Sequence, residues 1–186
     1  SDVSIKNNLL DTFCFVKDDG GGIYTHGATY PTSRRKITGN IIIHGVGAGK
    51  GSNDYEKRAV TGIYMDANTS NVDISDNTIT TCWQGIILQS TTNVSVRHNT
   101  VFDNLKQFTI VQDPDDDLVR NSTITNNTFF SKAPDKWGSH ITSSGYDMHI
   151  FGRLDDNFYA SPLADRMSIE PNVTPSQAER VDKDQR

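Results

Sequence analysis

The sequence predicts an all-β protein built as a solenoid of about six coils, in which short parallel strands stack on one another. Three observations predict it. An apolar-x-x-Asn pattern recurs six times, and a second strand-like marker follows the asparagine in several of these repeats. Asn, Thr, Ser, Asp and Gly are abundant, whereas Leu and Ala are sparse. This composition disfavours helices and favours short strands joined by turns.

The first repeat is aligned on its asparagine. The six asparagines are Asn8, Asn40, Asn77, Asn99, Asn127 and Asn157, and the apolar residues three positions earlier are Ile5, Ile37, Ile74, Val96, Ile124 and Leu154. The intervals between the asparagines are 32, 37, 22, 28 and 30 residues. The shortest fits one turn of a three-sided coil, and the longer ones indicate the same turn with an insertion. Internal repeats of this length are typical of solenoids.

The second marker is a short apolar strand after the asparagine turn. It reads GIYTH at 22–26, GIYMD at 62–66 and GIILQ at 85–89, with a weaker copy, QFTIV, at 107–111. Stacking equivalent strands about 4.8 Å apart would also stack the inward asparagines, which could then hydrogen-bond to one another along the axis. An antiparallel β-sandwich is the alternative, but a sandwich gives no reason for asparagines in register.

The pattern resembles the right-handed parallel β-helix family of pectate-lyase type, over roughly residues 1–160. We therefore expect a β-helix over 1–160 and a C-terminal tail or cap over 161–186, where the sequence becomes charged and contains prolines. Because the chain begins inside a repeat, we also expect the N-terminal end of the helix to be covered by the remainder of the same β-helix or by a second chain.

Bulk properties narrow the function. A length of 186 residues suits one main domain, and a net charge of −5 with a pI near 5.4 argues against nucleic-acid binding. No apolar run is long enough to span a membrane. The two cysteines, Cys14 and Cys82, fall two coils apart, which is too far for a disulfide.

Strand alternation predicts which side chains leave the core. It places one outward row at Tyr24, Tyr64 and Ile87 and a second at His26, Asp66 and Gln89. The longest insertions flank this face and would form the walls of a groove. Aromatic rings, carboxylates and cations together suit a sugar chain. The candidate substrate-binding residues are Tyr24, Tyr64, Trp83, Gln89, Lys57 and Arg58.

Two reactions fit such a groove. In glycoside hydrolysis, slightly favoured, two carboxyl groups flank the bond. Asp66 would be one and Glu56, Asp18 or Asp19 the other, with His26 tuning Asp66 or relaying a proton. In polysaccharide elimination, a His or Tyr takes the proton beside a uronate carboxylate and a cation stabilises the anion. A non-catalytic interpretation also remains. The protein would then be a carbohydrate-binding or structural β-helix of the tail-spike or adhesin type, and Asp66 would only cap a turn.

The segments DGGGIYTHG, GNIIIHG and GIYMDANTSNVDISDNT are similar to a group of secreted bacterial β-helix proteins, most of which act on carbohydrate. The resemblance covers residues 18–100. It implies a secreted or periplasmic protein with a polysaccharide or oligosaccharide ligand, and a site near Asp19, Tyr24, Tyr64 and Asp66.

No cofactor is expected. His44, His98 and His140 share no metal-like spacing, so zinc is not expected, and these histidines are assigned structural or exposed positions. Calcium remains an option at the acidic run with Asp113, Asp115 and Asp116. That run lacks the spaced pattern of a dedicated calcium loop, and a solvated turn is the simpler interpretation.

Overall fold

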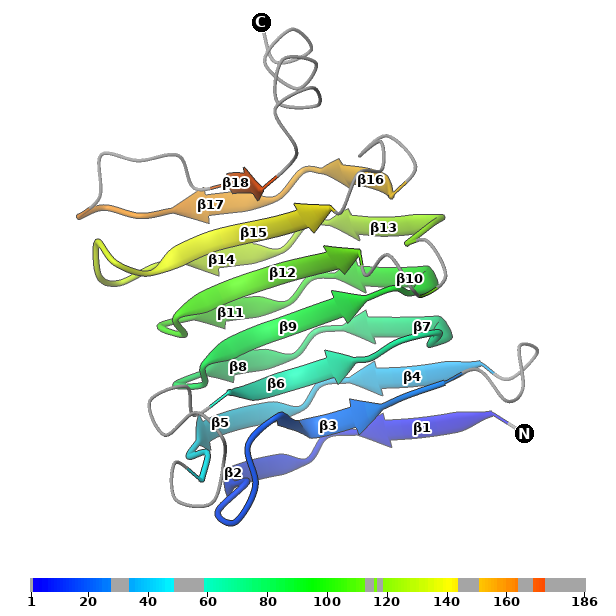
Figure 1. Ribbon diagram of the computed structural model, residues 1–186, viewed down its shortest axis with the longest axis horizontal. Coiled ribbons are helices and arrows are strands. Elements are labelled where there is room, and N and C mark those ends of the chain that lie inside the picture. Colours follow the sequence, from blue (N-terminus) through cyan, green and yellow to red (C-terminus); the bar gives the residue numbers. More distant parts are fainter. Residues whose placement is uncertain are drawn as a thin grey trace, which may run out of the picture.

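Three parallel sheets of six strands wrap around one core in the computed structural model, which describes residues 2–27, 34–48, 59–112, 116, 119–143, 151–163 and 169–172. Each coil contributes one strand to each sheet, and the coils stack in chain order from β1–β3 to β16–β18 (Figure 1). The predicted parallel solenoid of about six coils is confirmed. None of the described residues forms a helix long and apolar enough to cross a membrane.

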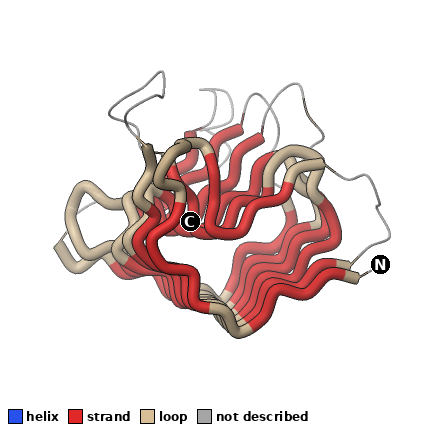
Figure 2. Tube along the Cα trace, turned by 90° about the horizontal axis from the view of Figure 1, so that it is seen from below, coloured by secondary structure: helices blue, strands red, loops and turns tan. Residues whose placement is uncertain are grey.

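The first sheet, sheet A, contains β1 (Val3–Lys6), β4 (Arg35–Thr38), β7 (Ser70–Ser75), β10 (Thr92–Arg97), β13 (Ser122–Thr125) and β16 (Gly152–Asp155). Sheet B contains β2 (Leu9–Phe13), β5 (Ile41–Gly45), β8 (Thr78–Thr80), β11 (Thr100–Phe102), β14 (Thr128–Phe130) and β17 (Phe158–Ala160). Sheet C contains β3 (Gly20–Thr25), β6 (Val60–Met65), β9 (Gln84–Gln89), β12 (Lys106–Gln112), β15 (Trp137–Ser143) and β18 (Ile169–Asn172). Seen along the axis, the coils superpose (Figure 2).

The repeated asparagines form the predicted ladder, at the turn between sheets A and B. The Nδ2 of Asn40 donates to Oδ1 of Asn77 at 2.9 Å, and the backbone N–H of Asn40 donates to the same oxygen at 2.9 Å. The same side-chain bond joins all six asparagines in order, Asn8, Asn40, Asn77, Asn99, Asn127 and Asn157. Buried turn polar groups are thereby satisfied, which an apolar residue could not do.

The residue before each ladder asparagine has a left-handed backbone conformation. These residues are Asn7, Gly39, Asp76, His98, Asn126 and Asp156, with φ between 54° and 67°. Gly, Asn and Asp tolerate this region best, because it crowds the Cβ of other residues. The residue before the asparagine can therefore vary in type but must adopt the left-handed backbone conformation, while the asparagine itself is required for its hydrogen bonds.

The core is a set of stacked aliphatic and aromatic rows. Ile63, Met65, Ile86 and Leu88 are completely buried, as the alternation of sheet C predicted. Glycines mark the corner where sheet C begins: a Cβ at Gly85 would meet the side chain of Val101 and a backbone oxygen of the next coil. Close approach of backbone to core requires glycine at this corner.

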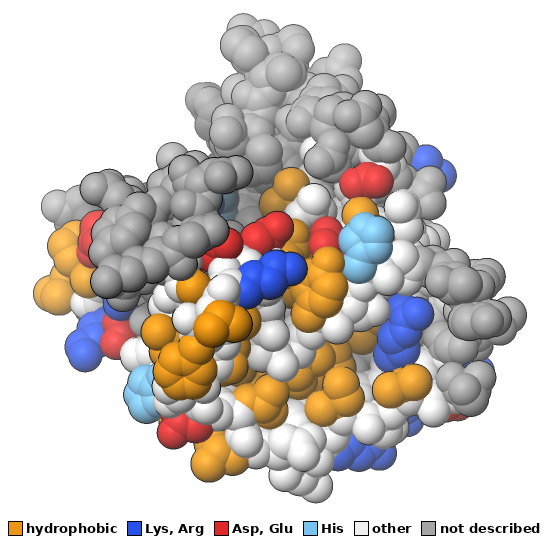
Figure 3. Space-filling model, turned by 60° about the horizontal axis from the view of Figure 1, so that its bottom comes forward, with side chains coloured by type: hydrophobic (Ala, Val, Ile, Leu, Met, Phe, Trp, Pro, Cys, Tyr) orange, Lys and Arg blue, Asp and Glu red, His pale blue; other side chains and the backbone are white. Residues whose placement is uncertain are grey.

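The N-terminal end of the core is open. A cavity of about 240 Å³ lies there, lined by apolar residues of sheets A and C that include Ile5, Ile23 and Ile37. Hydrophobic side chains gather on this end of the molecule (Figure 3). Exposed apolar residues near it include Val3, Leu9, Phe15 and Val16. The first strand of each sheet has a neighbour on one side only within the described chain.

Both cysteines are free thiols. Burial raises the pKa of the Cys82 thiol to about 12, so this thiol is inert at neutral pH.

Candidate functional site

The outer face of sheet C carries the residues that the sequence singled out. Tyr24 of β3 pairs in register with Tyr64 of β6, and Tyr64 pairs with Ile87 of β9. The predicted outward row is confirmed, and it continues through Thr109 of β12 to His140 of β15. The middle of this row is closed to solvent, because Ile87 and Thr109 are only 5% and 2% exposed. Tyr24, at 48% exposed, marks the accessible end.

Tyr24 and Asp66 are joined directly. The phenolic hydroxyl of Tyr24 donates to Oδ2 of Asp66 at 2.6 Å, while the backbone N–H of Ala67 donates to Oδ1 at 2.7 Å. Asp66 follows β6 immediately, and its own N–H donates to the carbonyl of Thr25 at 2.8 Å. The strand pairing therefore fixes the backbone at both ends of the contact, and the Tyr24 hydroxyl holds the carboxylate.

The next coil repeats the arrangement. The hydroxyl of Tyr64 donates to Oε1 of Gln89 at 2.8 Å. The rings of Tyr24 and Tyr64 pack edge to face with centroids 5.2 Å apart and an interplanar angle of 79°. Such aromatic pairs are favourable beyond the area they bury. The result is an ordered tyrosine pair next to one carboxylate and one amide, in which Tyr24 is exposed and Tyr64 is buried.

The phenols are held in the protonated state. The hydrogen bond to Asp66, followed by partial burial and the negative charges of Asp66 and Asp19, raises the pKa of Tyr24 to about 12. Burial, followed by the charges of Asp66 and Asp19, raises the pKa of Tyr64 further. Both phenols are therefore proton donors at neutral pH and poor general bases.

Asp19 belongs to the same neighbourhood, since its charge acts on both phenols. It is exposed, stands immediately before β3 and has a left-handed backbone conformation with φ 47°. His26 is also exposed, two residues beyond Tyr24. Among the described residues, no hydrogen bond or ion pair joins His26 to Asp66. The structure thus gathers Tyr24, Tyr64, Asp66 and Gln89, with His26 at their edge, while Asp19 stands at the edge where the strands of sheet C begin and acts on the phenols through its charge.

Trp83 is not brought to this group. It precedes β9, whereas Gln89 ends β9 and Asp66 follows the end of β6. In parallel strands all starts lie at one edge of the sheet and all ends at the other. Five residues of strand, about 16 Å, separate Gln84 from Gln89. Trp83 therefore lies at the opposite edge of sheet C from Asp66.

Several candidates cannot be placed. Glu56, Lys57 and Arg58 lie outside the described residues, as do Asp113 and Asp115 of the acidic run. Asp116 is described, and is partly exposed. No group of three or more His, Cys, Asp or Glu side chains in the described ranges could hold a metal ion.

A second cluster on sheet C was not anticipated from the sequence. Lys106 and His140 are joined by a 2.8 Å contact between Nζ and Nδ1, and Nζ also lies 5.3 Å from the ring centroid of Trp137. The rings of Trp137 and His140 are 4.6 Å apart at 75°. Burial, and then the charge of Lys106, lowers the pKa of His140 to about 4. The sequence assigned His140 only a structural or exposed position and did not single out Lys106, which stands 34 residues before it.

The two groups offer different chemistry. The Tyr24–Asp66 group presents a positioned carboxylate, held by a phenol that donates a hydrogen bond to it, which is one element of acid–base or nucleophilic chemistry at a sugar. The Lys106 cluster presents a cation beside aromatic rings, which suits binding of an anion carried on a ring.

The comparisons agree with this fold. A family model described as "Right handed beta helix region" matches residues 1–150. No curated protein and no solved structure gives a significant match. The family is compatible both with carbohydrate-active proteins and with structural β-helices. With 150 of its 186 residues matched, the chain belongs to the right-handed β-helix family.

Proposed function

We propose that the Tyr24–Asp66 group is the centre of a site that binds a polysaccharide and hydrolyses its glycosidic bonds. The observation that carries this proposal is the 2.6 Å hydrogen bond from the Tyr24 hydroxyl to Asp66 on an exposed part of the sheet C face. A carboxylate fixed by a neighbouring coil, beside the exposed ring of Tyr24, combines a reactive group with an aromatic ring that could contact a sugar.

Asp66 would act as the base or nucleophile. Its Oδ2 is held by Tyr24 and its Oδ1 by the N–H of Ala67. Each carboxylate oxygen retains a further lone pair, which could accept a hydrogen bond from a water as a base or attack a sugar carbon as a nucleophile. Hydrolysis also requires a second carboxyl group. Asp19 is the described candidate because its charge reaches both phenols, although it precedes β3 and so stands at the opposite edge of sheet C from Asp66. Tyr24 would position Asp66 and, with Gln89, contact the sugar, while the buried ring of Tyr64 would support Tyr24 from the neighbouring coil. Glu56 remains an alternative partner from the sequence.

Elimination is a weaker candidate. It needs a base together with a cation, and the described residues offer such a pair in His140 and Lys106. A histidine with a pKa near 4 is neutral but weakly basic, so it would remove a carbon-bound proton poorly. The tyrosines, with raised pKa values, are no better as bases.

The non-catalytic alternative draws on a specific observation. Asp66 accepts the N–H of the residue that follows it, which is what a turn-capping aspartate does. In that case the face would bind sugar without cleaving it. The proposal in either form is for a secreted or periplasmic protein that needs no cofactor.

A panel of neutral and acidic polysaccharides tests the proposal. Reducing ends and the ultraviolet absorbance of unsaturated uronates are followed together with the whole 186-residue chain. Hydrolysis predicts new reducing ends without absorbance. Both signals together would show elimination, and neither signal on any polysaccharide would leave only the binding or structural role.

A further inference from the structure

The edge at which the strands of sheet C begin concentrates aromatic and cationic residues. The two tryptophans of the chain both lie at this edge, Trp83 just before β9 and Trp137 at the start of β15. Lys106 begins β12, in the coil between them. Its N–H donates to the carbonyl of Trp83 at 3.1 Å, and Lys106 pairs in register with Trp137. Two coil spacings, about 10 Å, separate the tryptophan-bearing coils.

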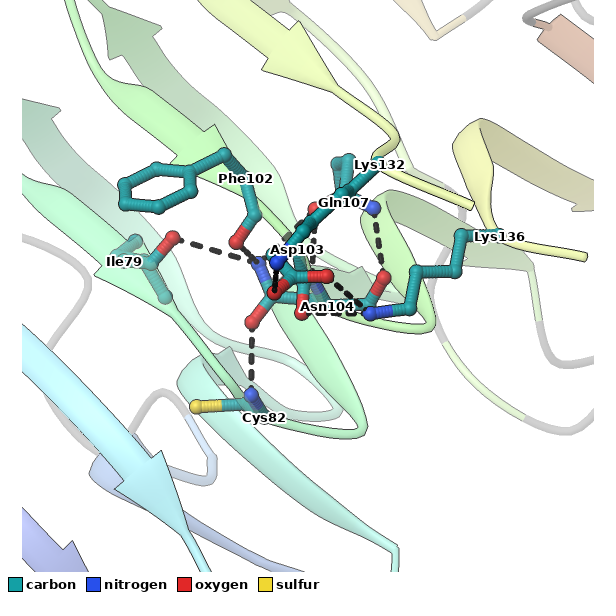
Figure 4. Close-up of polar contacts among 8 residues, drawn as sticks. All are labelled: Ile79, Cys82, Phe102, Asp103, Asn104, Gln107, Lys132 and Lys136. Atoms are coloured by element: carbon teal, nitrogen blue, oxygen red, sulfur yellow. Dashed lines mark hydrogen bonds and ion pairs between the residues drawn. The ribbon is translucent and has the colours of Figure 1, made fainter. Parts of the chain in front are cut away.

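The side chain of Lys106 points out of the solenoid. The neighbouring Gln107 is completely buried and binds Asn104 inside the corner, where its Oε1 accepts from Nδ2 of Asn104 at 3.0 Å (Figure 4). Lys106 instead reaches Nδ1 of His140 in the outward row. Because the imidazole is neutral at neutral pH, it accepts this hydrogen bond and fixes the ammonium group without neutralising it.

The adjoining turns add positive charge. Lys136 donates to the carboxylate and the backbone carbonyl of Asp103, and Lys132 lies 3.6 Å from the same carboxylate (Figure 4). One aspartate thus faces two lysines. Asp135, in the same turn, is exposed and offsets part of this charge. Lys106 adds a third lysine to this part of the edge, and Glu170 of β18 pairs in register with His140 in the next coil.

We infer that the edge formed by Trp83, Lys106, Trp137 and His140 is a second carbohydrate-binding site, selective for sugar chains that carry carboxylates. A sugar ring would pack on the indole of Trp137, and its carboxylate would accept a charge-assisted hydrogen bond from Lys106. The lysines of the neighbouring turns would attract further acidic units along the axis.

Other anionic polymers fit less well. Binding to nucleic acid depends on many phosphate contacts from a strongly basic surface, whereas this chain has more acidic than basic residues. A neutral glycan would contact the tryptophans but would offer no carboxylate to Lys106. An acidic glycan uses both features of the site.

This inference goes beyond the proposed function and does not depend on catalysis at Asp66. The two sites lie in different coils of sheet C, since Lys106 and His140 belong to β12 and β15, whereas Tyr24 belongs to β3 and Asp66 follows β6. Two coil spacings, about 10 Å, separate β6 from β12. Loss of Asp66 should leave binding at the Lys106 edge intact, and loss of Lys106 should leave the chemistry of Asp66 intact on short neutral substrates. Failure of either proposal can therefore be recognised separately.

Tryptophan fluorescence offers a direct test, because both tryptophans lie at this edge. The whole chain is titrated with a panel of uronate oligosaccharides and with the same oligosaccharides after methyl esterification, which removes the charge and keeps the ring. We expect the acidic forms to change the fluorescence and to bind about tenfold more tightly than the esters, with an affinity that falls as salt is added. Equal binding of acidic and esterified forms, or no binding of any acidic form, would overturn the inference.

Variants assign the effect to Lys106. Lys106→Gln should weaken binding of the acidic form about tenfold and leave binding of the ester unchanged, while Lys106→Arg should retain most of the affinity. Lys36→Gln removes the same charge from the exposed face of sheet A and should have no effect. Thermal unfolding of each variant checks that the coil is intact. Wild-type affinity in Lys106→Gln, or an equal loss in Lys36→Gln, would contradict the assignment.

Discussion

The hydroxyl of Tyr24 donates a 2.6 Å hydrogen bond to Oδ2 of Asp66, although 42 residues separate the two in the chain. The contact exists because β3 and β6 are parallel neighbours in sheet C, with Tyr24 opposite Tyr64. A side chain near the end of one strand therefore meets the residue that follows the next strand. The proposed chemistry depends on this contact, and so does the ionisation of Tyr24.

Replacing Asp66 with Asn should lower the pKa of Tyr24. The hydrogen bond to Asp66 is the largest cause of its raised value of about 12, and the charge of Asp66 adds to it. With a neutral acceptor the value should move back toward about 10. A spectrophotometric pH titration of tyrosinate measures this, and Tyr24→Phe identifies which transition belongs to Tyr24. An unchanged titration curve in Asp66→Asn would contradict the contact.

Replacing Asn77 with Ala should destabilise the fold strongly. Oδ1 of Asn77 accepts from both the backbone N–H and the Nδ2 of Asn40, and both donors are buried. Leaving them without an acceptor should cost about 3 kcal/mol in the free energy of unfolding. Chemical denaturation measures the loss. Asn8→Ala, at the exposed end of the ladder, is the matched control and should cost less than half as much.

Replacing Gly85 with Ala should also destabilise the protein. The new Cβ would meet Val101 in the core and the backbone oxygen of Gln107. Overpacking of this kind typically costs about 1–3 kcal/mol. Gly20→Ala is the control, because its Cβ would meet only the Cys14 sulfur at 3.3 Å and a backbone oxygen at 3.9 Å. Equal thermal midpoints for the two variants would show that the corner is not close-packed.

His140 should make the protein less stable in mild acid. Its folded-state pKa is lowered from 6.5 to about 4, so between these values the unfolded chain takes up a proton that the folded chain does not. Stability should therefore fall as pH drops from about 6.5 to about 4, with no contribution above that window. The loss should be on the order of 1 kcal/mol, since the ring is partly exposed.

His140→Gln removes this titration. The difference in thermal midpoint between this variant and the wild type should shift in favour of the variant as pH falls from 7 to about 4. A difference that does not vary with pH would mean that His140 is not held neutral by burial and by Lys106.

Much of the fold was predictable because asparagine recurs at the same turn of every coil. The asparagine amide both donates and accepts along the stack at the turn and recurs in every coil, so Asn40 and Asn77 can be aligned without any structure. Alternation along GIYMD then identified Ile63 and Met65 as core residues. The left-handed residue before each asparagine could not be recognised as such, because glycine, aspartate, histidine and asparagine all occupy that position.

The sites were less predictable, for a geometric reason. Proximity in sequence suggested that Trp83 accompanies Gln89, but a strand of six residues separates the two edges of sheet C. The pairing of Lys106 with His140 also escaped detection. It depends on the start of β12, where the successive residues Gln107 and Phe108 are both completely buried, so that simple alternation from Phe108 would wrongly turn Lys106 inward.

The most direct test of the central claim is the rate at which Asp66→Asn releases reducing ends from the polysaccharide that the wild type degrades. Asp76→Asn is the control, because Asp76 is exposed near the asparagine ladder, has φ 59°, and tolerates asparagine in that conformation. The account predicts a loss of at least about a hundredfold for Asp66→Asn, with both variants folded and Asp76→Asn fully active. Full activity in Asp66→Asn would contradict it.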